Sequence, residues 1–564
     1  MSAFPIPGTP TASPSTTLSF RGATPSQLRG LQVFGSHTGA RRGHVVAHSD
    51  GRGASFVPDQ PFEAGEIVTV HSDLAVRGAQ RGVYTFTIAR PATGADVNVA
   101  PRAPRATTPP PFASRPDLRP PTLKTIASRA GTAAGSILLT PNPALGQSTA
   151  DQSGPMIVDG RGRLVWFAPR APASSLDLEM QQYQGRPVLT WWEGNIRSAG
   201  YGDGEYVMMD QSYREIARIR AGNGYEADLH DLVITPQNTA LVMIYNPVLA
   251  SAATINRVYD RAVVDAVVQE IDIATGSVLF EWHSIGNVGL SESYLPVPAR
   301  TSDFYDYVHP NSLALDQDGN IWLSARHTWT VYKLDRITGA LFWRLGGKRS
   351  NFDMGSGTAF SWQHDAQPLD NGLMTVFDNA SSAPGVQSRN SSRGVELRVD
   401  EQEMSVELEQ SNENPQHALS LSQGDFQELP NGDSFAGWGS VAEYTEFAPN
   451  GDVKLDVNIN GGSASYRAFR VQWTGKPAAP PAVVAHASGG ALLIAASWNG
   501  ATGVARWAVR AGADSASLHP VGSFATAGFE TSMRVPVTGA HVVQVAAIGP
   551  AGRVLGTSRT VLVG

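Results

Sequence analysis

The sequence predicts an all-β chain in which a central β-propeller is flanked by two β-sandwiches. First, 57 glycines and 38 prolines divide the chain into many short elements, as all-β folds with frequent turns require. Second, a unit of two hairpins recurs through the middle of the chain, and the composition changes on either side of it. Third, 564 residues are too many for one ordinary core, so we expect several domains.

The repeated unit consists of two hairpin types that alternate. In the first type, a strand leads through a turn with Gly, Asn or Asp into a strand with a large aromatic or apolar residue. Examples of this type are segments 157–167, 270–282, 332–344 and 443–453. Examples of the second type are segments 234–242, 315–323 and 429–435. Two hairpins per unit give four strands per blade, which is typical of a β-propeller. Five or six units are visible, so the repeat leaves the blade number open.

The flanking regions predict smaller domains. Residues 1–90 contain short strand patterns between turn residues and predict a β-sandwich. Residues 91–124 are rich in proline and predict an extended linker, partly in the polyproline II conformation. The propeller is expected over 125–477. Residues 478–564 predict an immunoglobulin-like sandwich of the fibronectin III type, and we expect structural or adhesive support from both sandwiches.

Charge and cysteine content exclude several classes of function. The net charge of −7 is spread without a basic stripe, so no nucleic-acid partner is expected. No apolar stretch is long enough to span a bilayer, and no membrane partner is expected. The absence of cysteine excludes disulfides, thiolate nucleophiles and cysteine-bound metals. The opening residues lack the pattern of a signal peptide. The modular organisation favours a secreted or cell-surface protein whose leader was removed, with a cytoplasmic protein as the alternative.

Three histidines share one position in the repeat. His230, His309 and His364 each precede a strand that leads into the second hairpin type. Equivalent positions of successive blades lie at equal radii, so we expect these side chains to converge on the propeller axis. A single histidine of this kind is most simply structural, whereas three together favour a site. Arg326 ends the strand after the His309 hairpin, and its guanidinium offers a forked donor for a tetrahedral oxyanion. A salt bridge between blades is the alternative.

Five motifs follow one another between Asp306 and Asn379. They are His309-Pro310-Asn311-Ser312, Leu323–Thr328, Thr338–Lys348, Trp362-Gln363-His364-Asp365 and Phe377-Asp378-Asn379. In this order and spacing they resemble the bacterial and fungal branch of the arylsulfate sulfotransferase family. The resemblance extends over about 137–473 and is looser over the flanking domains.

The resemblance implies a six-bladed propeller that moves a sulfuryl group from one phenol to another, with no nucleotide donor and no cofactor. In this family a central histidine is transiently sulfated, and His364 matches it. His309 and Asn311 match the family's His-x-Asn pair. Arg326 matches its site arginine, and His230 matches a further histidine.

The implied chemistry agrees with the residue types. A neutral imidazole is nucleophilic near neutral pH, and attack on sulfur would expel a phenolate and leave a sulfated histidine. Arg326, His309 and Asn311 are expected to donate to the sulfuryl oxygens. A protonated His230 or His309 would protonate the leaving phenol and later deprotonate the acceptor.

Further residues are expected to bind substrate or to orient the histidines. Asp365 or Asp231 would orient an imidazole ring, and Asn379 closes the last motif of the site. Aromatic walls for the phenol are expected from Trp362 and Tyr307, as from Trp191 and Trp192, although most such residues in propellers are core. The substrate-binding set is therefore Trp362, Tyr307, Asp365 and Asn379.

Other functions remain as alternatives. Clustered His and Asp suit zinc or iron, but no tight His-x-x-x-His spacing exists, and we expect no metal. Segment 316–320 resembles a calcium loop but lacks the closing glutamate. A non-catalytic propeller that binds a glycan, a peptide or a cell-wall polymer is the main alternative, although such a module needs no axial histidine beside an arginine. A quinone-dependent dehydrogenase finds no support in the residues.

Overall fold

The computed structural model describes residues 1–92, 111–143, 151–170, 173–250, 261–299, 303–536 and 538–564. Regular structure in these ranges is almost entirely β-strand, which confirms the predicted all-β class. Three short 3₁₀ turns complete it: η1 (Pro25–Gly30), η2 (Leu290–Glu292) and η3 (Asp370–Gly372). Within the described ranges, no helix has the length and apolar character needed to cross a membrane.

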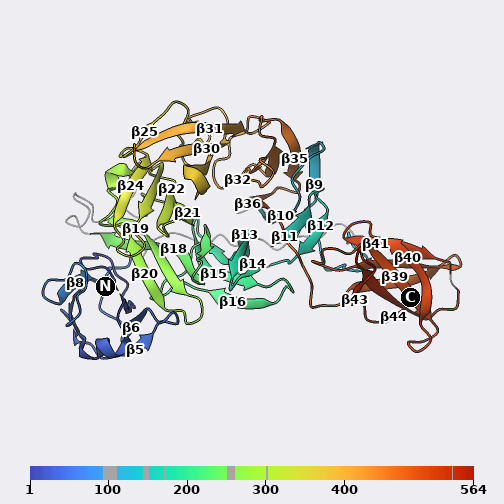
Figure 1. Ribbon diagram of the computed structural model, residues 1–564, viewed down its shortest axis with the longest axis horizontal. Coiled ribbons are helices and arrows are strands. Elements are labelled where there is room, and N and C mark those ends of the chain that lie inside the picture. The colour runs from blue at the N-terminus through green and yellow to red at the C-terminus, as the bar shows by residue number, and fades with distance from the viewer. Residues whose placement is uncertain (93–110, 144–150, 171–172, 251–260, 300–302, 537) are drawn as a thin grey trace.

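Six sheets of four or five strands form the middle of the described chain and follow one another around a ring (Figure 1). Sheet 1 contains β12 (Leu164–Phe167), β11 (Met156–Asp159), β10 (Ser136–Pro143) and β36 (Ser463–Val471). Sheet 2 contains β13 (Ser174–Tyr183), β14 (Arg186–Ile196), β15 (Gly202–Met209) and β16 (Glu215–Ile219). Sheet 3 contains β17 (Leu232–Ile234), β18 (Thr239–Ala250), β19 (Arg261–Asp272) and β20 (Val278–His283).

The other three sheets complete the ring. Sheet 4 contains β21 (Pro310–Leu315), β22 (Ile321–Ala325), β23 (Thr330–Leu334) and β24 (Leu341–Gly346). Sheet 5 contains β25 (Asp353–Met354), β31 (Ser405–Glu413), β30 (Arg393–Asp400), β27 (Leu373–Asp378) and β26 (His364–Pro368). Sheet 6 contains β32 (Asp425–Glu428), β33 (Ser434–Gly437), β34 (Glu443–Phe447), β35 (Val453–Ile459) and β9 (Leu123–Ser128). A small hairpin, β28 (Ser381–Ala383) and β29 (Val386–Gln387), lies between β27 and β30 in the sequence.

Strands from both ends of the ring segment close it. The early strand β9 pairs with β35 in sheet 6, and the late strand β36 pairs with β10 in sheet 1. Two neighbouring sheets therefore each combine strands that lie far apart in the sequence. This exchange holds the first and last parts of the ring together by backbone hydrogen bonds.

The turns that were expected to form hairpins do so. Between β23 and β24, the Gly339 amide donates to the Asp335 carbonyl (2.7 Å), and the Thr338 hydroxyl donates to the Asp335 carboxylate (2.6 Å). Gly339 has a φ of +71°, a conformation that glycine adopts without steric cost. The Asp-x-x-Thr-Gly pattern thus encodes this hairpin directly.

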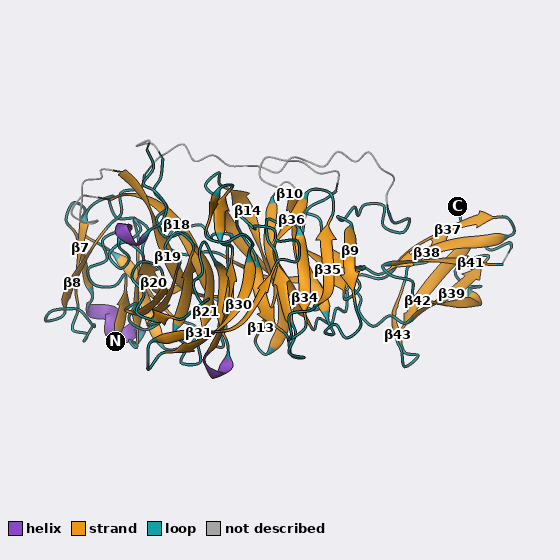
Figure 2. Cartoon of the chain, turned by 90° about the horizontal axis from the view of Figure 1, so that it is seen from above, coloured by secondary structure: helices purple, strands orange, loops and turns teal. Residues whose placement is uncertain are grey.

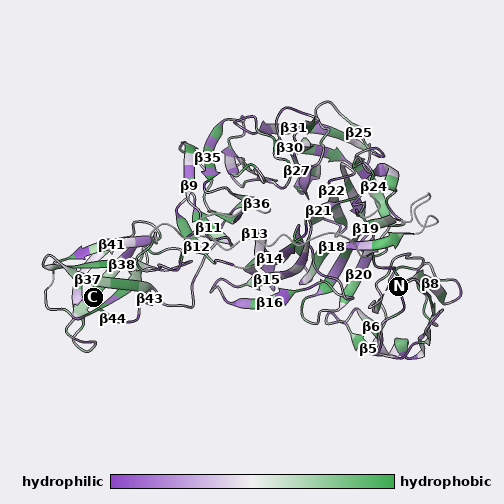
Figure 3. Ribbon diagram, turned by 180° about the vertical axis from the view of Figure 1, so that it is seen from behind, coloured by the Kyte–Doolittle hydropathy of each residue, from purple (hydrophilic) through white to green (hydrophobic). Residues whose placement is uncertain are grey.

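Buried apolar side chains fill the spaces between neighbouring sheets. One cluster joins sheets 3 and 4 and includes Trp282, Tyr307, Leu313 and Tyr332. Another joins sheets 2 and 3 and also contains Tyr466 of β36. Hydrophobic and hydrophilic residues both occur along the strands of the ring (Figure 3), so the sheets present polar groups as well as core.

Two sheets at the N-terminal end lie beside sheet 3 (Figure 1). They are β1 (Ser2–Phe4), β2 (Leu18–Arg21), β6 (Gly53–Pro58) and β5 (Gly43–Ala47), and β4 (Gly39–Ala40), β3 (Gln32–Gly35), β7 (Ile67–His71) and β8 (Val83–Thr87). The Thr11 hydroxyl donates to Asp265 of β19 (2.6 Å), and Phe4 packs edge-on against Phe280 of β20. The N-terminal residues are therefore tied to the ring by polar and apolar contacts.

Two further sheets form the C-terminal end, on the opposite side of the ring (Figure 2). They are β37 (Ala482–Ser488), β38 (Ala491–Ser497) and β41 (Glu530–Val535), and β40 (His519–Ala525), β39 (Arg506–Gly512), β42 (Val542–Ile548) and β43 (Val554–Thr557), with β44 (Val561–Leu562) on β42. The Asn499 side chain accepts from the Phe167 amide (3.0 Å) and donates to the Phe167 carbonyl (2.9 Å). It connects this end to sheet 1.

Most of the expected proline-rich linker, residues 93–110, lies outside the described residues. Its described end contacts the C-terminal sheets. The Ser114 amide and hydroxyl donate to the Glu530 carboxylate (2.6 and 2.5 Å), and the Phe112 and Phe529 rings lie 4.5 Å apart. This end of the expected linker is therefore held against β41.

Candidate active site

In each of three successive sheets, one strand starts at or just after one of the expected histidines. His230 precedes β17, His309 precedes β21, and His364 is the first residue of β26. Their exposed fractions are 3%, 6% and 1%. The rings of His230 and His309 lie 5.1 Å apart between centroids. The Tyr466 ring contacts both His230 (5.8 Å) and His364 (6.5 Å), so the structure brings all three histidines into one cluster.

The chain enters this cluster in an unusual backbone conformation. His309, Trp362 and Asp365 have φ values of +51°, +55° and +49°. Non-glycine residues seldom adopt positive φ, and such residues concentrate at functional sites where the surrounding structure enforces them. The entries to β21 and β26 are therefore shaped by their surroundings rather than by local preference.

Each ring is oriented by a specific polar partner. His230 Nδ1 lies 2.5 Å from Asp228 Oδ2, and His309 Nδ1 is hydrogen-bonded to the Asp306 carboxylate. His364 Nδ1 lies 2.7 Å from Asn379 Oδ1. Two carboxylates and one neutral amide thus hold the three rings, which sets His364 apart from the other two.

The Asn379 amide fixes the tautomer of His364. Its NH₂ group donates to the carbonyls of Ser420 (3.0 Å) and Gln423 (2.9 Å), so its oxygen faces the imidazole as an acceptor. His364 therefore carries its proton on Nδ1 and a lone pair on Nε2. That lone pair accepts a hydrogen bond from the Gln423 backbone amide (3.1 Å).

The cluster keeps His364 uncharged. Burial is the main cause that holds the pKa of His364 well below its usual value, and the nearby Arg326 lowers it further. Burial, His230 and Arg326 likewise hold the pKa of His309 well below its ordinary range. At neutral pH the His364 ring is therefore a free base with a fixed lone pair, the form that acts as a nucleophile.

Arg326 supplies a cation beside the histidines. Its Nη1 donates to His327 Nε2 (3.0 Å), its Nη2 donates to the Leu421 carbonyl (2.9 Å), and its Cζ lies 5.2 Å from the Trp362 ring centre. Its Nε is buried and has no hydrogen-bond partner among the described residues. Burial lowers the pKa of Arg326 to about 10, so the guanidinium stays charged at neutral pH.

This combination of buried histidines and a partly satisfied arginine occurs in a segment that a family model recognises. The model described as Arylsulfotransferase (ASST) matches residues 179–460. The chain belongs to the arylsulfotransferase family. The resemblance drawn from the five motifs is thereby confirmed. The match ends before β36, so Tyr466 and Arg467 lie outside it.

Other comparisons add little to this arylsulfotransferase-family assignment. No curated protein matches the chain. A Bacteroides caccae protein of unknown function is 13% identical with a TM-score of 0.36, and the match covers 60% of this chain and all of that one. The periplasmic gluconolactonase PpgL of Pseudomonas aeruginosa is 13% identical with a TM-score of 0.31, covering 77% and 97% of the two chains. Likenesses this weak carry no information on the chemistry of the site.

Two of the expected substrate-binding residues of this arylsulfotransferase-family chain are placed away from the rings. Tyr307 is fully buried in the core between sheets 3 and 4, and its hydroxyl donates to Ser284 (3.1 Å). The Asp365 carboxylate accepts from Gln367 (2.9 Å) and faces Arg467 (3.8 Å). Neither Asp365 nor Asp231 orients an imidazole ring, because Asp228, Asp306 and Asn379 do so.

The remaining expected residues are distributed between the site and its support. The Trp362 ring packs edge-on against His327 (5.9 Å) and lies next to Arg326. The Asn311 amide nitrogen donates to the Gln363 carbonyl (2.6 Å), while its side-chain oxygen is buried without a partner among the described residues. Trp191 and Trp192 are fully buried core residues.

Several residues of the site were missed by sequence reasoning. Asp228 and Asp306 lie two and three positions before a site histidine, and this spacing was a signal for ring partners. His327 follows Arg326 directly; its Nδ1 donates to the Asp306 carbonyl (2.6 Å), and its ring lies 4.5 Å from that of His309. Tyr245, which stacks on His230 (5.5 Å), had no sequence signal.

Two groups of side chains in the described ranges have ligand atoms close enough to hold a metal ion: Asp306, His309 and His327, and Asp177, Glu179 and Asp231. In the first group, Nδ1 of both imidazoles is already hydrogen-bonded to Asp306. In the second group, the guanidinium of Arg467 is the cation that the carboxylates face. Both groups thus have partners from the chain itself.

Proposed function

We propose that this protein is a nucleotide-independent aryl sulfotransferase that moves a sulfuryl group from a phenolic sulfate ester to a phenolic acceptor. The transfer proceeds in two half-reactions through a sulfated His364. The family assignment supports the sulfotransferase class. The observation that carries the mechanism is the neutral, Nδ1-protonated His364, fixed by Asn379 beside the cationic Arg326.

In the first half-reaction, the Nε2 lone pair of His364 attacks sulfur. An N–S bond forms, the bond between sulfur and the aryl oxygen breaks, and the phenolate leaves. The Gln423 amide must release Nε2 before the attack, and its N–H then becomes free to donate to a sulfuryl oxygen. Splitting the transfer through a covalent intermediate replaces one difficult step by two easier ones.

Arg326 stabilises the charge on the sulfuryl oxygens. A planar guanidinium binds a tetrahedral anion through more than one N–H, and its unpartnered Nε lies in a largely buried site. His327 holds one Nη of Arg326 through Nε2. Donors that are already fixed in place stabilise the transition state without reorganisation.

His230 is the proton carrier that the geometry favours. Its Nδ1 faces the Asp228 carboxylate (2.5 Å), which holds the proton on Nδ1 and leaves Nε2 to exchange a proton with the substrate. His309 is less suited to this role, because burial, His230 and Arg326 hold its pKa well below its ordinary range. A protonated His230 gives its Nε2 proton to the leaving phenolate. In the second half-reaction it takes the proton of the acceptor phenol, whose oxygen attacks sulfur as the N–S bond breaks.

We also propose that the six sheets of the ring are the blades of a six-bladed propeller, the domain expected over 125–477, with β9 beginning two residues earlier at Leu123. The proposed site lies where β17, β21 and β26, one strand each of sheets 3, 4 and 5, begin. The pairs of sheets at 1–90 and 478–564 are β-sandwiches that support the ring. We place the protein outside the cell or on its surface on the grounds of this modular organisation.

The test is the release of p-nitrophenol from p-nitrophenyl sulfate, with and without phenol, by wild type and by His364→Ala. We expect release that phenol stimulates in the wild type and that the substitution reduces at least about 1,000-fold, because the covalent route is lost. Denatured wild type, taken after mixing with donor alone, should carry one sulfuryl group on the peptide that contains His364.

His417 provides the matched control, because its side chain is 76% exposed and lies on the same ring. His417→Ala should retain wild-type release. Release that survives His364→Ala would remove His364 as the nucleophile while leaving the reaction in place. Absence of release from a broad panel of aryl sulfates would contradict the proposed function and favour a propeller that binds a glycan, a peptide or a cell-wall polymer.

A further inference from the structure

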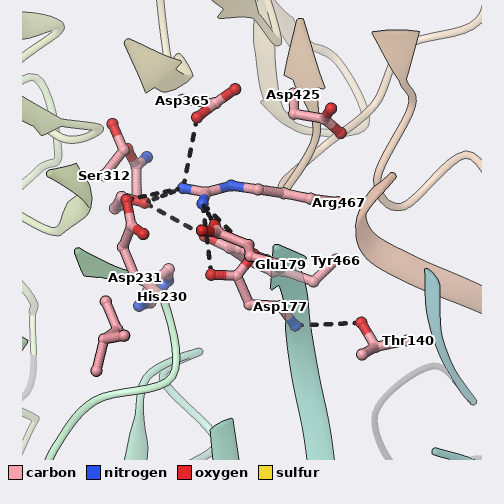
Figure 4. Close-up of polar contacts among 12 residues, drawn as sticks. Thr140, Asp177, Glu179, His230, Asp231, Ser312, Asp365, Asp425, Tyr466 and Arg467 are labelled. Atoms are coloured by element: carbon pink, nitrogen blue, oxygen red, sulfur yellow. Dashed lines mark hydrogen bonds and ion pairs between the residues drawn. The ribbon is translucent and has the colours of Figure 1, made fainter. Parts of the chain in front are cut away.

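One buried arginine contacts the neighbours of all three site histidines. Arg467 lies on β36, the strand that closes the ring, and its side chain is 1% exposed. Figure 4 shows its guanidinium among Asp177, Glu179, Asp231 and Asp365, with His230 close to Asp231. The family match ends at residue 460, so neither the motifs nor the match assigns this residue a role.

Arg467 Nη2 contacts a residue that lies one or two positions after each of the three histidines. Nη2 donates to the carbonyl of Asn311 (3.0 Å), two residues after His309. It pairs with the carboxylate of Asp231 (3.3 Å), one residue after His230, and lies 3.8 Å from that of Asp365, one residue after His364. One side chain thus contacts the chain at the start of β17, of β21 and of β26.

A second set of contacts joins the same strands to each other. Asp231 accepts a hydrogen bond from the Leu313 amide (2.8 Å), and the Ser312 hydroxyl accepts one from the Ala366 amide (3.0 Å). Tyr466, the residue before Arg467, directs its hydroxyl to the Asn311 carbonyl (3.4 Å). Asp231 and the Asn311 carbonyl also contact Arg467, and the Ser312–Ala366 bond joins the adjacent residues of β21 and β26, so the strand entries form one polar layer.

The charge balance of this layer depends on Arg467. Its Nη1 lies 2.9 Å from Glu179 and 3.4 Å from Asp177. Burial by itself would lower the pKa of Arg467, but Asp177, Asp231 and Asp365 raise it well above its ordinary value. Without this cation, several buried carboxylates would face one another unpaired, which is strongly unfavourable in a low-dielectric interior.

Two carboxylates of this layer, Asp231 and Asp365, also line a cavity. This cavity of about 510 Å³ is lined by later residues of the same strands, among them Val233, Leu315 and Gln367, together with Glu179 and Asp231. Asp231 and Asp365 each follow a site histidine by one residue and face Arg467. The strands that line the cavity are therefore the same ones that start at the histidines.

We propose that Arg467 is the positioning residue that sets the distances among His230, His309 and His364. It acts through Asp231, Asn311 and Asp365 and does not touch the reacting atoms. This inference rests on the proposed function, since it assigns Arg467 a part in sulfuryl transfer. Misplacement of a reacting group by about 1 Å can reduce a rate about 100-fold, so the role predicts a loss in kcat rather than in substrate affinity.

The test compares Arg467→Met and Arg467→Lys with a matched control, Arg470→Met. Arg470 lies on the same strand, is 3% exposed and pairs with the buried Glu446 (2.8 Å), but none of its contacts involves a histidine of the site. We expect Arg467→Met to lower kcat at least about 100-fold while KM for p-nitrophenyl sulfate changes less than about threefold. Compared with Arg467→Met, Arg467→Lys should recover more of the wild-type thermal stability than of the wild-type kcat. An ammonium keeps the positive charge but lacks the two-pronged donor of the guanidinium.

A second readout does not depend on activity. In protein labelled with ¹⁵N in its histidines, the imidazole signals of His230 and His364 should shift in Arg467→Met and remain at the wild-type positions in Arg470→Met. Wild-type ring signals and wild-type kcat in a folded Arg467→Met protein would overturn the positioning role. If the wild type transfers no sulfuryl group, the proposed function fails, and the ring signals alone decide whether Arg467 positions the histidines.

Discussion

His283 is the buried cation of the contact between the N-terminal residues and sheet 3. Its Nδ1 lies 2.7 Å from Asp265, its Nε2 lies 3.1 Å from Glu281, and its side chain is 3% exposed. Thr11 donates to the same Asp265 carboxylate. Burial alone would lower the pKa of His283, but Asp265 and Glu281 raise it to about 10. We predict that His283→Gln destabilises the protein because it leaves two buried carboxylates without a cation.

The magnitude follows from the pKa. A shift from 6.5 to about 10 at about 1.4 kcal/mol per pKa unit corresponds to about 5 kcal/mol, and breaking a buried ion pair costs about 3–5 kcal/mol. Because the folded-state pKa is raised, the stabilisation is complete below pH 6.5. It falls by about 1.4 kcal/mol per pH unit above that and is lost as the pH passes about 10.

The assay is urea-induced unfolding of wild type and His283→Gln between pH 6 and 10.5, followed by tryptophan fluorescence. The difference in unfolding free energy should be about 3–5 kcal/mol at pH 6 and should shrink steadily toward pH 10. His417→Gln, at an exposed histidine, should show neither effect. A difference between wild type and His283→Gln that stays constant over this pH range would refute the protonated state of His283.

Two further predictions concern the site itself. Asn379→Leu removes the acceptor of the His364 Nδ1 proton, which costs one buried hydrogen bond, or about 1–3 kcal/mol. With p-nitrophenyl sulfate as substrate, we expect kcat to fall about 10- to 100-fold with little change in KM. An unchanged kcat would contradict the tautomer assigned to His364. Arg326→Lys keeps the positive charge but loses the forked donor of the guanidinium. In the same assay we expect kcat to fall about 100-fold or more. Wild-type turnover in this variant would show that the guanidinium is not needed in the transition state.

The position of the histidines was predictable because the repeat of two hairpins assigns residues of successive units to equivalent places in successive sheets. Equivalent residues of successive units begin equivalent strands, and the structure shows His230, His309 and His364 at the starts of β17, β21 and β26. Arg326 was predictable in the same way, since it follows the second strand of the same hairpin. The all-β class followed from turn residues that encode hairpins locally, as at Asp335–Gly339.

The orientation of the rings was not predictable from the repeat. Asp365 directly follows His364 in the sequence, yet the positive φ of Asp365 accompanies a side chain that faces Arg467 instead of the imidazole. The partner of His364 is Asn379, on the loop after the neighbouring strand β27. Tyr307 was expected to supply an aromatic wall for the phenol, but it belongs to the core between sheets 3 and 4. Side-chain direction at these irregular strand entries depends on tertiary contacts that no local pattern records.

The closure of the ring and the geometry of the site depend on the same strand. β36 pairs with β10 and so joins the end of the ring segment to its beginning, and the same strand places Tyr466 against His230 and His364. Arg467, the next residue, binds the strand entries of sheets 3, 4 and 5. A ring that had not closed would therefore lack both the aromatic contact and the cation that align the histidines. The site is complete only when the last strand is in place, which makes the relative positions of the histidines a property of the closed ring rather than of the motifs that carry them.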